Sequence, residues 1–581
     1  MTGVLAPVVL TSDVPLGFVP PRVLDDLERG AAQRGTAVFL AERDGAAWRT
    51  LTYGDALRRV RSVAAGMLAR GASPERPVAI VADNGIDHAV IAHAAMYCGV
   101  PVAPLSTGYA RGDADPQRLR ALLEVLAPAF VFASDETLAA RVRATGTGAA
   151  VVTDVTELLG DDVAGADAAF GRIVPETVAK ILFTSGSTGT PKGVLTTNRM
   201  LASNQTMIAQ GWPAATTDPV LVDWLPWSHC FGGSHNFGIA LRHGGTYYID
   251  AGKPVPGLFE VTLANLREVA PTAYFNVPRG FALLLDALER DAGLATTFFS
   301  RVELVCNAGA ALPEPLRARL NALVATYVAD RTVAIVSSWG TTETAPLATG
   351  CWGNPLPEHD TIGMPMPGVA IKLEPDGDRY EIRVKGPNVT PGYWRNPAAT
   401  AAAFDAEGYY RTGDAVALRD PADPARGIDF RGRIAENFKL SSGTWVNVGS
   451  LRLALCEAAA PLIEDVVVAG HDSDAIAVLV FFALDHARAV ARLPNAERAE
   501  LAQHPAVRER IRSAFAAHNV AASGSSTRVA RALLLADAPN RAAGEITDKG
   551  SLNQARALAF RAAHVALLLG PAHPDVIALV D

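Results

Sequence analysis

Cysteine is scarce in this 581-residue sequence, and its positions follow no pattern. The five are Cys98, Cys230, Cys306, Cys351 and Cys456. Because their number is odd and their spacing matches no metal-ligand motif, they indicate neither a disulfide framework nor a cysteine-ligated metal. We expect reduced, buried thiols in a cytoplasmic protein.

Long apolar runs and a basic charge balance are also missing. No run reaches the roughly 18 apolar residues that would suggest a membrane span, and residues 1–21 hold no Lys or Arg for a secretory leader. The formal net charge of -8 gives no broad basic field, which argues against nucleic acid as a partner. With 49% hydrophobic and 19% charged residues, the chain is typical of a globular protein, and its length predicts two or more domains.

Lysine is the third scarce residue. Lys and Arg together number 52, but only seven are lysines. They are Lys180, Lys192, Lys253, Lys372, Lys385, Lys439 and Lys549. Where arginine fills most surface positions, each remaining lysine is a better functional candidate than usual.

The most informative stretch is residues 179–194, AKILFTSGSTGTPKGV. Its first apolar residues predict a buried strand, and a loop of hydroxyls and glycines follows. Gly186 and Gly189 let loop N–H groups converge on phosphate oxygens, and Lys192 adds a positive charge. The spacing is not that of a Walker A loop. The alternative is a flexible surface turn, but a buried strand and Pro-Lys-Gly-Val frame this one.

At this point the chain resembles the adenylate-forming superfamily of acyl-CoA synthetases, luciferases and peptide-synthetase adenylation domains. The superfamily's loop T-S-G-S/T-T-G-x-P-K-G is matched without a gap. Residues 339–343 (WGTTE) resemble its Y-G-x-T-E motif, with Trp339 in place of tyrosine. The resemblance implies an ATP/AMP site that includes Thr184, Ser185, Gly186, Ser187, Thr188, Gly189, Lys192, Gly309, Ala310, Ala311, Trp339, Gly340, Thr341, Asp414 and Arg433.

Within that site, the resemblance implies distinct roles. The aromatic Trp339 and the segment Gly309–Ala311 would lie against adenine, Thr342 would touch the α-phosphate, and Glu343 would bind Mg²⁺. Asp414 would accept both ribose hydroxyls, for which a carboxylate is well suited. A cation that bridges phosphates needs few protein ligands, so Glu343 would be enough.

The segment 225–233, LPWSHCFGG, resembles the superfamily's L-P-x-x-H-x-x-G motif. It implies that His229 lies at the mouth of an acyl pocket. By family position the pocket comprises His229, Phe231, Ser234, Gly340 and Pro346. A satisfied core histidine is the alternative for His229, and it is our interpretation of His235.

The C-terminal segments depart from the commonest pattern. Where relatives carry a catalytic lysine, this chain has Glu545, and Lys549 follows four residues later. One helical turn would bring it to the same place, so we predict that Lys549 supplies the charge. The hinge position usually held by Asp or Lys is Ala435. The segments 438–446 (FKLSSGTWV) and 544–550 (GEITDKG) resemble the feruloyl-CoA synthase branch, bacterial ligases that act on hydroxycinnamates. That resemblance implies a CoA-binding loop with Lys439, Ser442, Gly443, Thr444 and Trp445.

Strands that alternate with helices predict parallel βαβ units. Residues 1–24 are expected to form an extended arm. With the resemblance, the predicted fold is α/β: a large N-terminal domain, 1–434, followed by a small mobile α+β lid domain, 435–581. The first would hold two doubly wound subdomains to about residue 360 and a distorted β-barrel at about 361–434, where Gly, Pro and Asp turns separate short alternating segments.

Three functions remain open from the sequence. The first is an ATP- and Mg²⁺-dependent CoA ligase for ferulate or a related hydroxycinnamate. The second is a ligase for a medium-chain fatty acid or benzoate. The third is a non-catalytic adenylate-binding protein, for which Glu545 and Ala435 are the support. The partners would be a carboxylic acid, ATP and CoA, and a homodimer, frequent in such families, is compatible with each.

Overall fold

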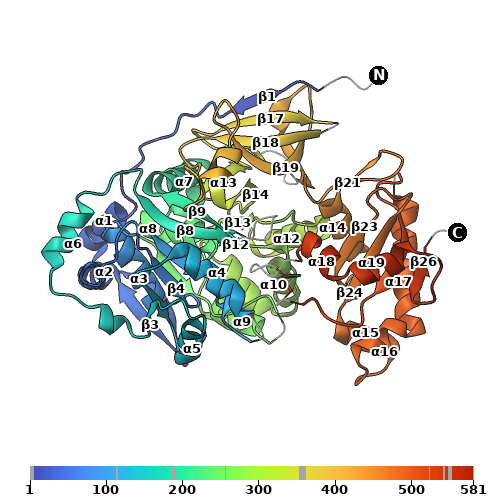
Figure 1. The fold of residues 1–581 in the computed structure, drawn as a ribbon, viewed down its shortest axis with the longest axis horizontal. Helices are drawn as coiled ribbons and strands as arrows, with labels where there is room; N and C mark the ends of the chain where they lie inside the picture. The colour runs from blue at the N-terminus through green and yellow to red at the C-terminus, as the bar shows by residue number, and fades with distance from the viewer. Residues whose placement is uncertain are drawn as a thin grey trace. The chain divides into compact units, whose positions relative to one another are not determined.

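The predicted alternation of strands and helices builds the larger part of the molecule (Figure 1). The computed structural model describes residues 5–112, 115–184, 191–255, 257–352, 361–377, 379–522, 524–540, 543–546 and 552–579. The chain divides into a larger unit, Met1–Thr412 with Leu418–Asp429, and a smaller unit, Gly413–Ala417 with Phe430–Asp581. The α/β fold with a large N-terminal and a small C-terminal part is therefore confirmed. The chain enters the smaller unit at Gly413, returns to the larger unit for Leu418–Asp429 and enters the smaller unit again at Phe430. These changes lie before the predicted boundary at 434/435.

The larger unit contains three mixed sheets built around parallel strands. The first, in the order β7-β6-β4-β5-β8-β9, comprises β4 (Val78–Val81), β5 (Val102–Leu105), β6 (Phe130–Ala133), β7 (Ala150–Val152), β8 (Val178–Thr184) and β9 (Lys192–Thr197). The second, β10-β11-β2-β3, comprises β2 (Val38–Asp44), β3 (Ala47–Thr52), β10 (Val220–Asp223) and β11 (Thr246–Ile249). The third, β12-β13-β14-β15-β16, comprises β12 (Ala273–Asn276), β13 (Leu304–Asn307), β14 (Ala334–Gly340), β15 (Leu347–Gly350) and β16 (Met364–Pro365).

Helices cover these sheets. They are α1 (Asp25–Arg34), α2 (Tyr53–Ala69), α3 (Ile86–Tyr97), α4 (Pro116–Leu126), α5 (Glu136–Ala144), α6 (Val163–Phe170), α7 (Asn198–Gly211), α8 (Phe237–His243), α9 (Phe259–Glu268), α10 (Pro278–Arg290), α11 (Ala292–Phe299) and α12 (Glu314–Tyr327). Strands β4, β5 and β6 are buried at every residue, as expected of parallel strands with both faces covered. The Thr52 side chain caps α2 by accepting from the Asp55 N–H, a position at which threonine is favoured.

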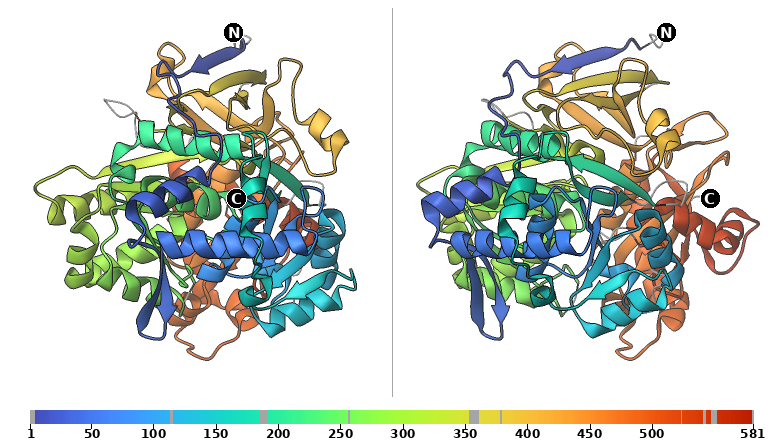
Figure 2. Two further views of the ribbon diagram at one scale, coloured as in Figure 1. Left: turned by 90° about the vertical axis from the view of Figure 1, so that its left-hand side faces the viewer. Right: turned by 60° about the vertical axis from the view of Figure 1, so that its left-hand side comes forward.

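The N-terminal arm is an edge strand. Strand β1 (Val8–Thr11) pairs antiparallel with β17 (Ala370–Asp376), more than 350 residues later. The sheet, in the order β1-β17-β18-β19-β20, continues with β18 (Arg379–Lys385), β19 (Tyr410–Leu418) and β20 (Ile428–Arg433), and α13 (Pro397–Ala402) precedes β19. Figure 2 shows the dark blue β1 beside this sheet in two further orientations. The sequence predicts the extended arm but not its partner, because pairing so distant leaves no local signal.

The smaller unit is a four-stranded sheet between helices, next to a short hairpin. Its strands are β21 (Phe438–Lys439), β22 (Trp445–Val446), β23 (Ile463–Ala469), β24 (Ile476–Phe482), β25 (Val529–Leu534) and β26 (Val576–Ala578). Its helices are α14 (Val448–Ala458), α15 (Leu484–Ala491), α16 (Arg498–Gln503), α17 (Pro505–Ala521), α18 (Gln554–Phe560) and α19 (Ala562–Leu569). Both faces of β24 are buried, one in each of two apolar clusters, so the unit has a core of its own.

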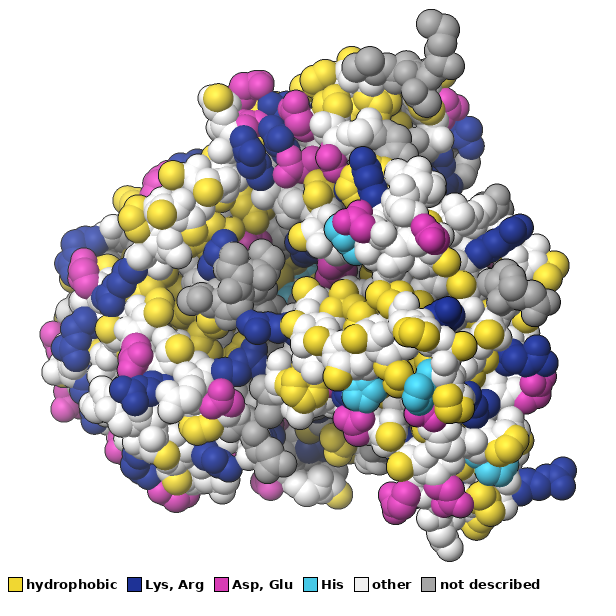
Figure 3. Space-filling view, turned by 45° about the vertical axis from the view of Figure 1, so that its right-hand side comes forward, with side chains coloured by type: hydrophobic (Ala, Val, Ile, Leu, Met, Phe, Trp, Pro, Cys, Tyr) yellow, Lys and Arg dark blue, Asp and Glu magenta, His cyan; other side chains and the backbone are white. Residues whose placement is uncertain are grey.

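The surface agrees with the charge balance of the sequence. On the face shown in Figure 3, Lys and Arg side chains are interspersed with Asp and Glu side chains. No helix among the described residues has the length and apolar character needed to cross a membrane. Cys98, Cys230, Cys306 and Cys351 are buried, as predicted, whereas Cys456 is only half-buried.

Candidate active site

The central element of the site is the turn that follows β14, the third parallel strand of its sheet. Ligand sites of open α/β sheets lie at the carboxyl ends of the strands. Gly340 ends the strand, and a side chain there would collide with the Pro346 carbonyl. Thr342 and Glu343 form the next turn and are 9% and 8% exposed. Two predicted pocket residues, Gly340 and Pro346, are thus neighbours.

Two asparagines clamp this turn from other elements. The Asn204 amide of α7 donates to the Leu347 carbonyl at 2.9 Å, and its oxygen accepts from the Leu347 N–H at 3.1 Å. The Asn388 amide donates to the Thr344 and Leu347 carbonyls at 3.1 and 2.8 Å. These bonds supply side-chain partners to buried backbone groups of Thr344 and Leu347. The backbone beside Glu343 is therefore fixed before any ligand binds.

Tyr393 connects the turn to the phosphate-loop strand. Its hydroxyl donates to Glu343 Oε1 at 3.1 Å, and the Lys192 ammonium lies 5.4 Å from the centre of its ring. The Tyr410 hydroxyl is 3.4 Å from that of Tyr393. A carboxylate and an ammonium, separated by about 150 residues of sequence, thus share one aromatic side chain. A bound polyphosphate needs both: cations for its oxygens and a carboxylate for its metal.

Backbone hydrogen bonds hold Tyr393 in this position. The Leu195 N–H donates to the Gly392 carbonyl at 3.0 Å, and the Trp394 N–H donates to the Gly193 carbonyl at 2.7 Å. Upstream, the Thr390 N–H donates to the Glu343 carbonyl at 2.8 Å. The segment 390–394 thereby joins β9 to the Glu343 turn.

The predicted pocket residues after β10 lie on a π-helix, η4 (Phe231–Asn236). Such wide turns occur frequently at functional sites. Phe231 and Ser234 are buried on it, and His229, half-buried, lies two residues before its start. The Cys230 sulfur is 3.7 Å from Thr342 Oγ1, so this segment touches the Glu343 turn. His235 is 1% exposed, and its Nδ1 lies 2.8 Å from the Asn236 side-chain oxygen. Its Nε2 has no hydrogen-bond partner among the described residues, so His235 is buried but only one of its ring nitrogens is satisfied.

Other predicted nucleotide residues lie at strand ends of the same unit. Gly309, Ala310 and Ala311 follow β13 and are exposed, and the Asn307 amide donates to the Ala310 carbonyl at 2.7 Å. Trp339 and Thr341 are half-buried on either side of Gly340. Thr184 pairs with Lys192 where β8 and β9 meet. Between them, Ser185, Gly186, Ser187, Thr188 and Gly189 lie outside the described residues, as does Lys549.

Within the smaller unit, two further groups of predicted residues come together. Arg433 Nε is 2.9 Å from Asp414 Oδ1, and the carboxylate is buried. The predicted CoA-binding residues form one exposed hairpin turn between β21 and β22: Lys439 pairs with Trp445, and its ammonium lies 4.9 Å from the indole centre. At the tip, Gly443 has φ +79° and open space where a Cβ would be, so a ligand could approach the backbone closely.

Glu545, which stands where relatives carry a lysine, is a core residue. It is fully buried, and its carboxylate accepts from Arg561 Nε and Nη2, both at 2.8 Å. Asn540 N–H adds a third bond at 2.6 Å. The backbone of Glu545 also bonds to Asn540 and Asn553. Its side chain therefore holds the chain in place on both sides of residues 547–551.

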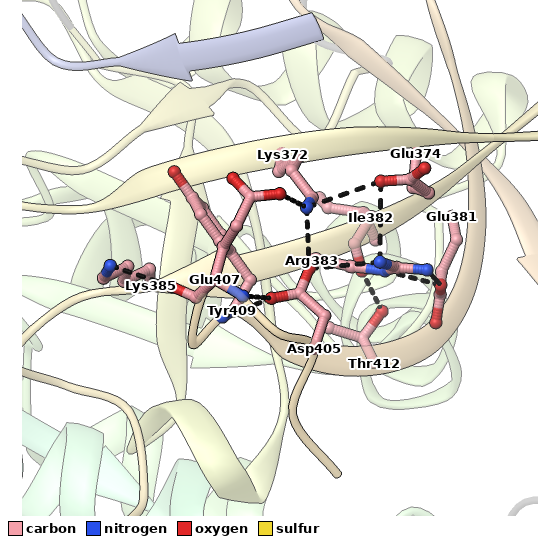
Figure 4. Close-up of polar contacts among 10 residues, drawn as sticks. All are labelled: Lys372, Glu374, Glu381, Ile382, Arg383, Lys385, Asp405, Glu407, Tyr409 and Thr412. Carbon is pink, nitrogen blue, oxygen red and sulfur yellow. Dashed lines mark hydrogen bonds and ion pairs between the residues drawn. The ribbon is translucent and has the colours of Figure 1, made fainter. Parts of the chain in front are cut away.

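Two lysines belong to a polar network on the sheet β1-β17-β18-β19-β20 (Figure 4), and Lys372 makes its ion pairs. Lys372, 7% exposed, contacts Asp405 and Glu407 at 2.7 Å and Glu374 at 3.5 Å. Lys385 donates to the Glu407 carbonyl at 3.0 Å. These pairs fix the loop that leads into β19. Lysine scarcity therefore does not by itself distinguish functional from structural lysines.

The described residues limit the kind of metal that the site could hold. Within those ranges, no group of three or more His, Cys, Asp or Glu side chains could bind a metal ion. Glu343 is a single buried carboxylate whose orientation Tyr393 fixes. That fits Mg²⁺, which commonly takes one or two carboxylates together with substrate phosphates.

Comparison with known proteins agrees with this geometry. The sequence model of the family described as AMP-binding enzyme matches residues 27–394, more than half of the chain. The chain belongs to this family. The match begins in α1 and ends at Trp394, so it includes Lys192, Glu343 and Tyr393.

Curated relatives of this AMP-binding enzyme include ligases and reductases. A 3-[(3aS,4S,7aS)-7a-methyl-1,5-dioxo-octahydro-1H-inden-4-yl]propanoyl:CoA ligase of Rhodococcus jostii is 28% identical over 68% of this chain and 76% of its own length. A carboxylic acid reductase of Segniliparus rugosus is 26% identical over 73% of this chain, but the match spans only 39% of the reductase. A mitochondrial malonate–CoA ligase of Mus musculus is 28% identical over 50% of this chain and 53% of its own length.

Solved structures share the fold across nearly the whole chain. The A domain of the Segniliparus rugosus reductase, in complex with AMP and a co-purified carboxylic acid, has a TM-score of 0.71 at 20% identity and covers 94% of both chains. The o-succinylbenzoate coenzyme A synthetase of Bacillus subtilis, in complex with AMP, has a TM-score of 0.66 at 19% identity, covering 92% of this chain and 97% of its own.

Several residues of the site escape sequence reasoning. Tyr393, Tyr410, Asn204 and Asn388 lie outside the motifs described in the sequence analysis. Their contacts join segments far apart in sequence, so no local pattern could reveal them. Lys180 could have been singled out, because it is one of only seven lysines in the sequence.

Proposed function

We propose that this chain is an ATP-dependent acid:CoA ligase that forms an acyl-AMP and then an acyl-CoA thioester. The observation that carries the proposal is the pair Glu343 and Lys192, joined through Tyr393 inside the region that matches the AMP-binding family. Two relatives named as CoA ligases support the second half-reaction. We further propose ferulate or a related hydroxycinnamate as the acid, on the resemblance of the segments around Lys439 and Lys549.

In the first half-reaction a carboxylate oxygen of the acid attacks the α-phosphorus of ATP. The bond from that phosphorus to the bridging oxygen breaks, and pyrophosphate leaves. The chemical demand is electrostatic, because negative charge is shared among carboxylate and phosphate oxygens. Lys192 and Thr342 would supply positive charge and a hydroxyl donor, and we propose that Lys549 adds an ammonium group.

Mg²⁺, when bound, would neutralise charge on the phosphates, and Glu343 is the residue proposed to hold it. The contribution of the chain is to hold that carboxylate in one orientation. The Tyr393 hydroxyl donates to the carboxylate itself, and the Thr390 N–H donates to the Glu343 backbone carbonyl and so holds the backbone that carries it.

In the second half-reaction the CoA sulfur attacks the acyl carbon, the bond from that carbon to the phosphate oxygen breaks, and AMP leaves. The thiol proton passes to solvent. The exposed turn at Ser442, Gly443 and Thr444 is the proposed contact for the pantetheine arm. No serine or cysteine nucleophile is needed, since the adenylate is already an activated acyl donor.

The buried Glu545–Arg561 pair weakens the third function considered from the sequence. A non-catalytic binding protein was suggested partly by glutamate at a lysine position. Because Glu545 has a structural partner, its presence needs no loss of activity to explain it.

The test is CoA-dependent AMP formation by the full chain with ATP, Mg²⁺ and a panel of acids. Ferulate, 4-hydroxycinnamate, benzoate and octanoate separate the proposed acid class from its alternatives. AMP and thioester formed together support the ligase, and AMP formed without thioester would restrict the activity to adenylation. The proposal fails if no acid releases AMP.

A further inference from the structure

Lys180 is a lysine of the protein interior that has no carboxylate partner. It lies on β8, and its ammonium donates to the Gly233 carbonyl, with Ser234 Oγ 3.5 Å away. Within the described ranges, no Asp or Glu side chain pairs with it. The other interior lysine, Lys372, contacts three carboxylates. Lys180 therefore carries a charge that no carboxylate of the described residues compensates.

Such a charge is costly to keep. Desolvation lowers the pKa of Lys180 to about 8, so the side chain remains mostly cationic at neutral pH. An interior cation is ordinarily paired or replaced by an apolar residue. Lys180 also stays half-buried and not fully enclosed, although its charged end is deep enough to be desolvated. Part of Lys180 therefore remains accessible, so a ligand could reach it.

The surroundings place Lys180 at the predicted acyl pocket. Gly233 and Ser234 belong to the π-helix η4, and side chains at Gly232 or Gly233 would collide with the Leu225 and Trp227 carbonyls. The backbone of this turn therefore packs directly against neighbouring backbone. The Lys180 ammonium contacts one of the carbonyls of the turn, that of Gly233.

At its other end the same segment contacts the reaction centre. Cys230, an electrostatic neighbour of Lys180, lies 3.7 Å from Thr342 Oγ1. A substrate whose carboxylate sits at Thr342 would extend along this segment toward Lys180.

We propose that Lys180 is a specificity-determining residue whose ammonium donates a hydrogen bond to an oxygen at the distal end of the acid substrate. The substrate class is an acid with a second acceptor oxygen, such as a phenol, a ketone or a second carboxylate, remote from the reacting carboxylate. The inference rests on the proposed ligase function and narrows it, since a plain alkyl or phenyl tail would leave the ammonium unpaired.

The geometry of the ammonium allows this bond. Lysine has three N–H donors, of which one meets the Gly233 carbonyl and another faces Ser234 Oγ. A third remains for a ligand. Sites that hydrogen-bond a substrate group discriminate strongly against analogues that lack it, because the buried donor is then left unpaired.

The experiment compares matched acids in matched variants. For the wild type, kcat/KM is measured with 4-hydroxycinnamate against cinnamate, and with octanedioate against octanoate. At least one oxygen-bearing acid should be preferred, and Lys180→Met should lower that preference about 10-fold or more. Lys180→Gln keeps a donor for the Gly233 carbonyl without the charge, and should lose much of the preference while it retains the fold.

Gln205→Met is the control for a purely structural role. Gln205 also holds η4, because its amide donates to the Ser234 and His235 carbonyls at 3.1 and 3.0 Å, yet it brings no charge. The Gln205→Met substitution should lower kcat/KM by the same factor for every acid and so leave the preference unchanged.

Two outcomes would overturn the inference. One is a wild type with equal kcat/KM for both members of each pair, and the other is a Lys180→Met variant whose kcat/KM falls by the same factor for every acid. Absence of AMP formation with every acid would instead contradict the ligase proposal itself.

Discussion

The Tyr393 hydroxyl donates a hydrogen bond to the Glu343 carboxylate at 3.1 Å. The Lys192 ammonium lies over the ring of the same tyrosine. Tyr393 therefore contacts both the proposed metal ligand, Glu343, and the phosphate-loop lysine, and helps to fix their relative positions. Partners that orient a metal ligand contribute strongly to metal affinity. This pair therefore offers a direct test of how the site is organised.

Tyr393→Phe should raise the Mg²⁺ concentration required for half-maximal activity about 10-fold. The ring and its contact with Lys192 remain, so the KM for the acid should change little. Titration of Mg²⁺ in an AMP-release assay measures the effect. Tyr409→Phe is the control, because Tyr409 lies beside Lys372 and Lys385 in the sheet. An equal response of both variants would contradict a specific role for Tyr393.

Arg561→Met should destabilise the smaller unit by about 3–5 kcal/mol, because Glu545 would be left buried without its partner. Arg512→Met removes an exposed pair with Glu509, both side chains being more than 50% exposed, and should cost under about 1 kcal/mol. Scanning calorimetry of the full chain measures both. Transitions shifted equally would show that the Glu545–Arg561 pair contributes little.

Lys549→Ala should abolish adenylation while a preformed acyl-AMP is still converted to thioester. The reason is that the proposed role of Lys549 is confined to charge that develops on carboxylate and α-phosphate in the first half-reaction. Each half-reaction is followed separately by pyrophosphate release and by thioester formation. Adenylation at the wild-type rate would show that another group supplies the charge.

The preference for octanedioate over octanoate should decline as pH rises through about 8. Below that pH Lys180 is cationic, and above it the proton is lost, because burial holds the pKa near 8. The neighbouring His88 and His93 stay neutral from pH 7 upward, since desolvation lowers their pKa values to about 4 and 3. Cys230 is the remaining titratable neighbour, and Cys230→Ser serves as the control. A preference that is unchanged from pH 7 to 9.5 would contradict the role of the ammonium.

Much of the fold could be predicted because its signals are local. The apolar runs of β4, β5 and β6 and the cap at Thr52 are visible in the sequence, and the match of residues 179–194 indicates the family. The placement of Thr342, Glu343, Gly340 and Pro346 around one turn follows from a single short segment.

The remaining features depend on contacts between distant segments. Nothing in the sequence near Glu343 points to Tyr393 or Asn388, and nothing near Val8 indicates that it pairs with β17. Glu545 is the instructive case: its position in a motif suggested a lost catalytic group, whereas the fold gives it a partner 16 residues later. A buried ion pair leaves no periodic pattern.

The most direct test of the central claim is acid-dependent exchange of labelled pyrophosphate into ATP, without CoA, by the full chain. Adenylation of a carboxylic acid predicts exchange that requires both the acid and Mg²⁺ and that Glu343→Gln reduces at least 10-fold. Exchange that proceeds without acid, or none with any acid of the panel, would contradict the account.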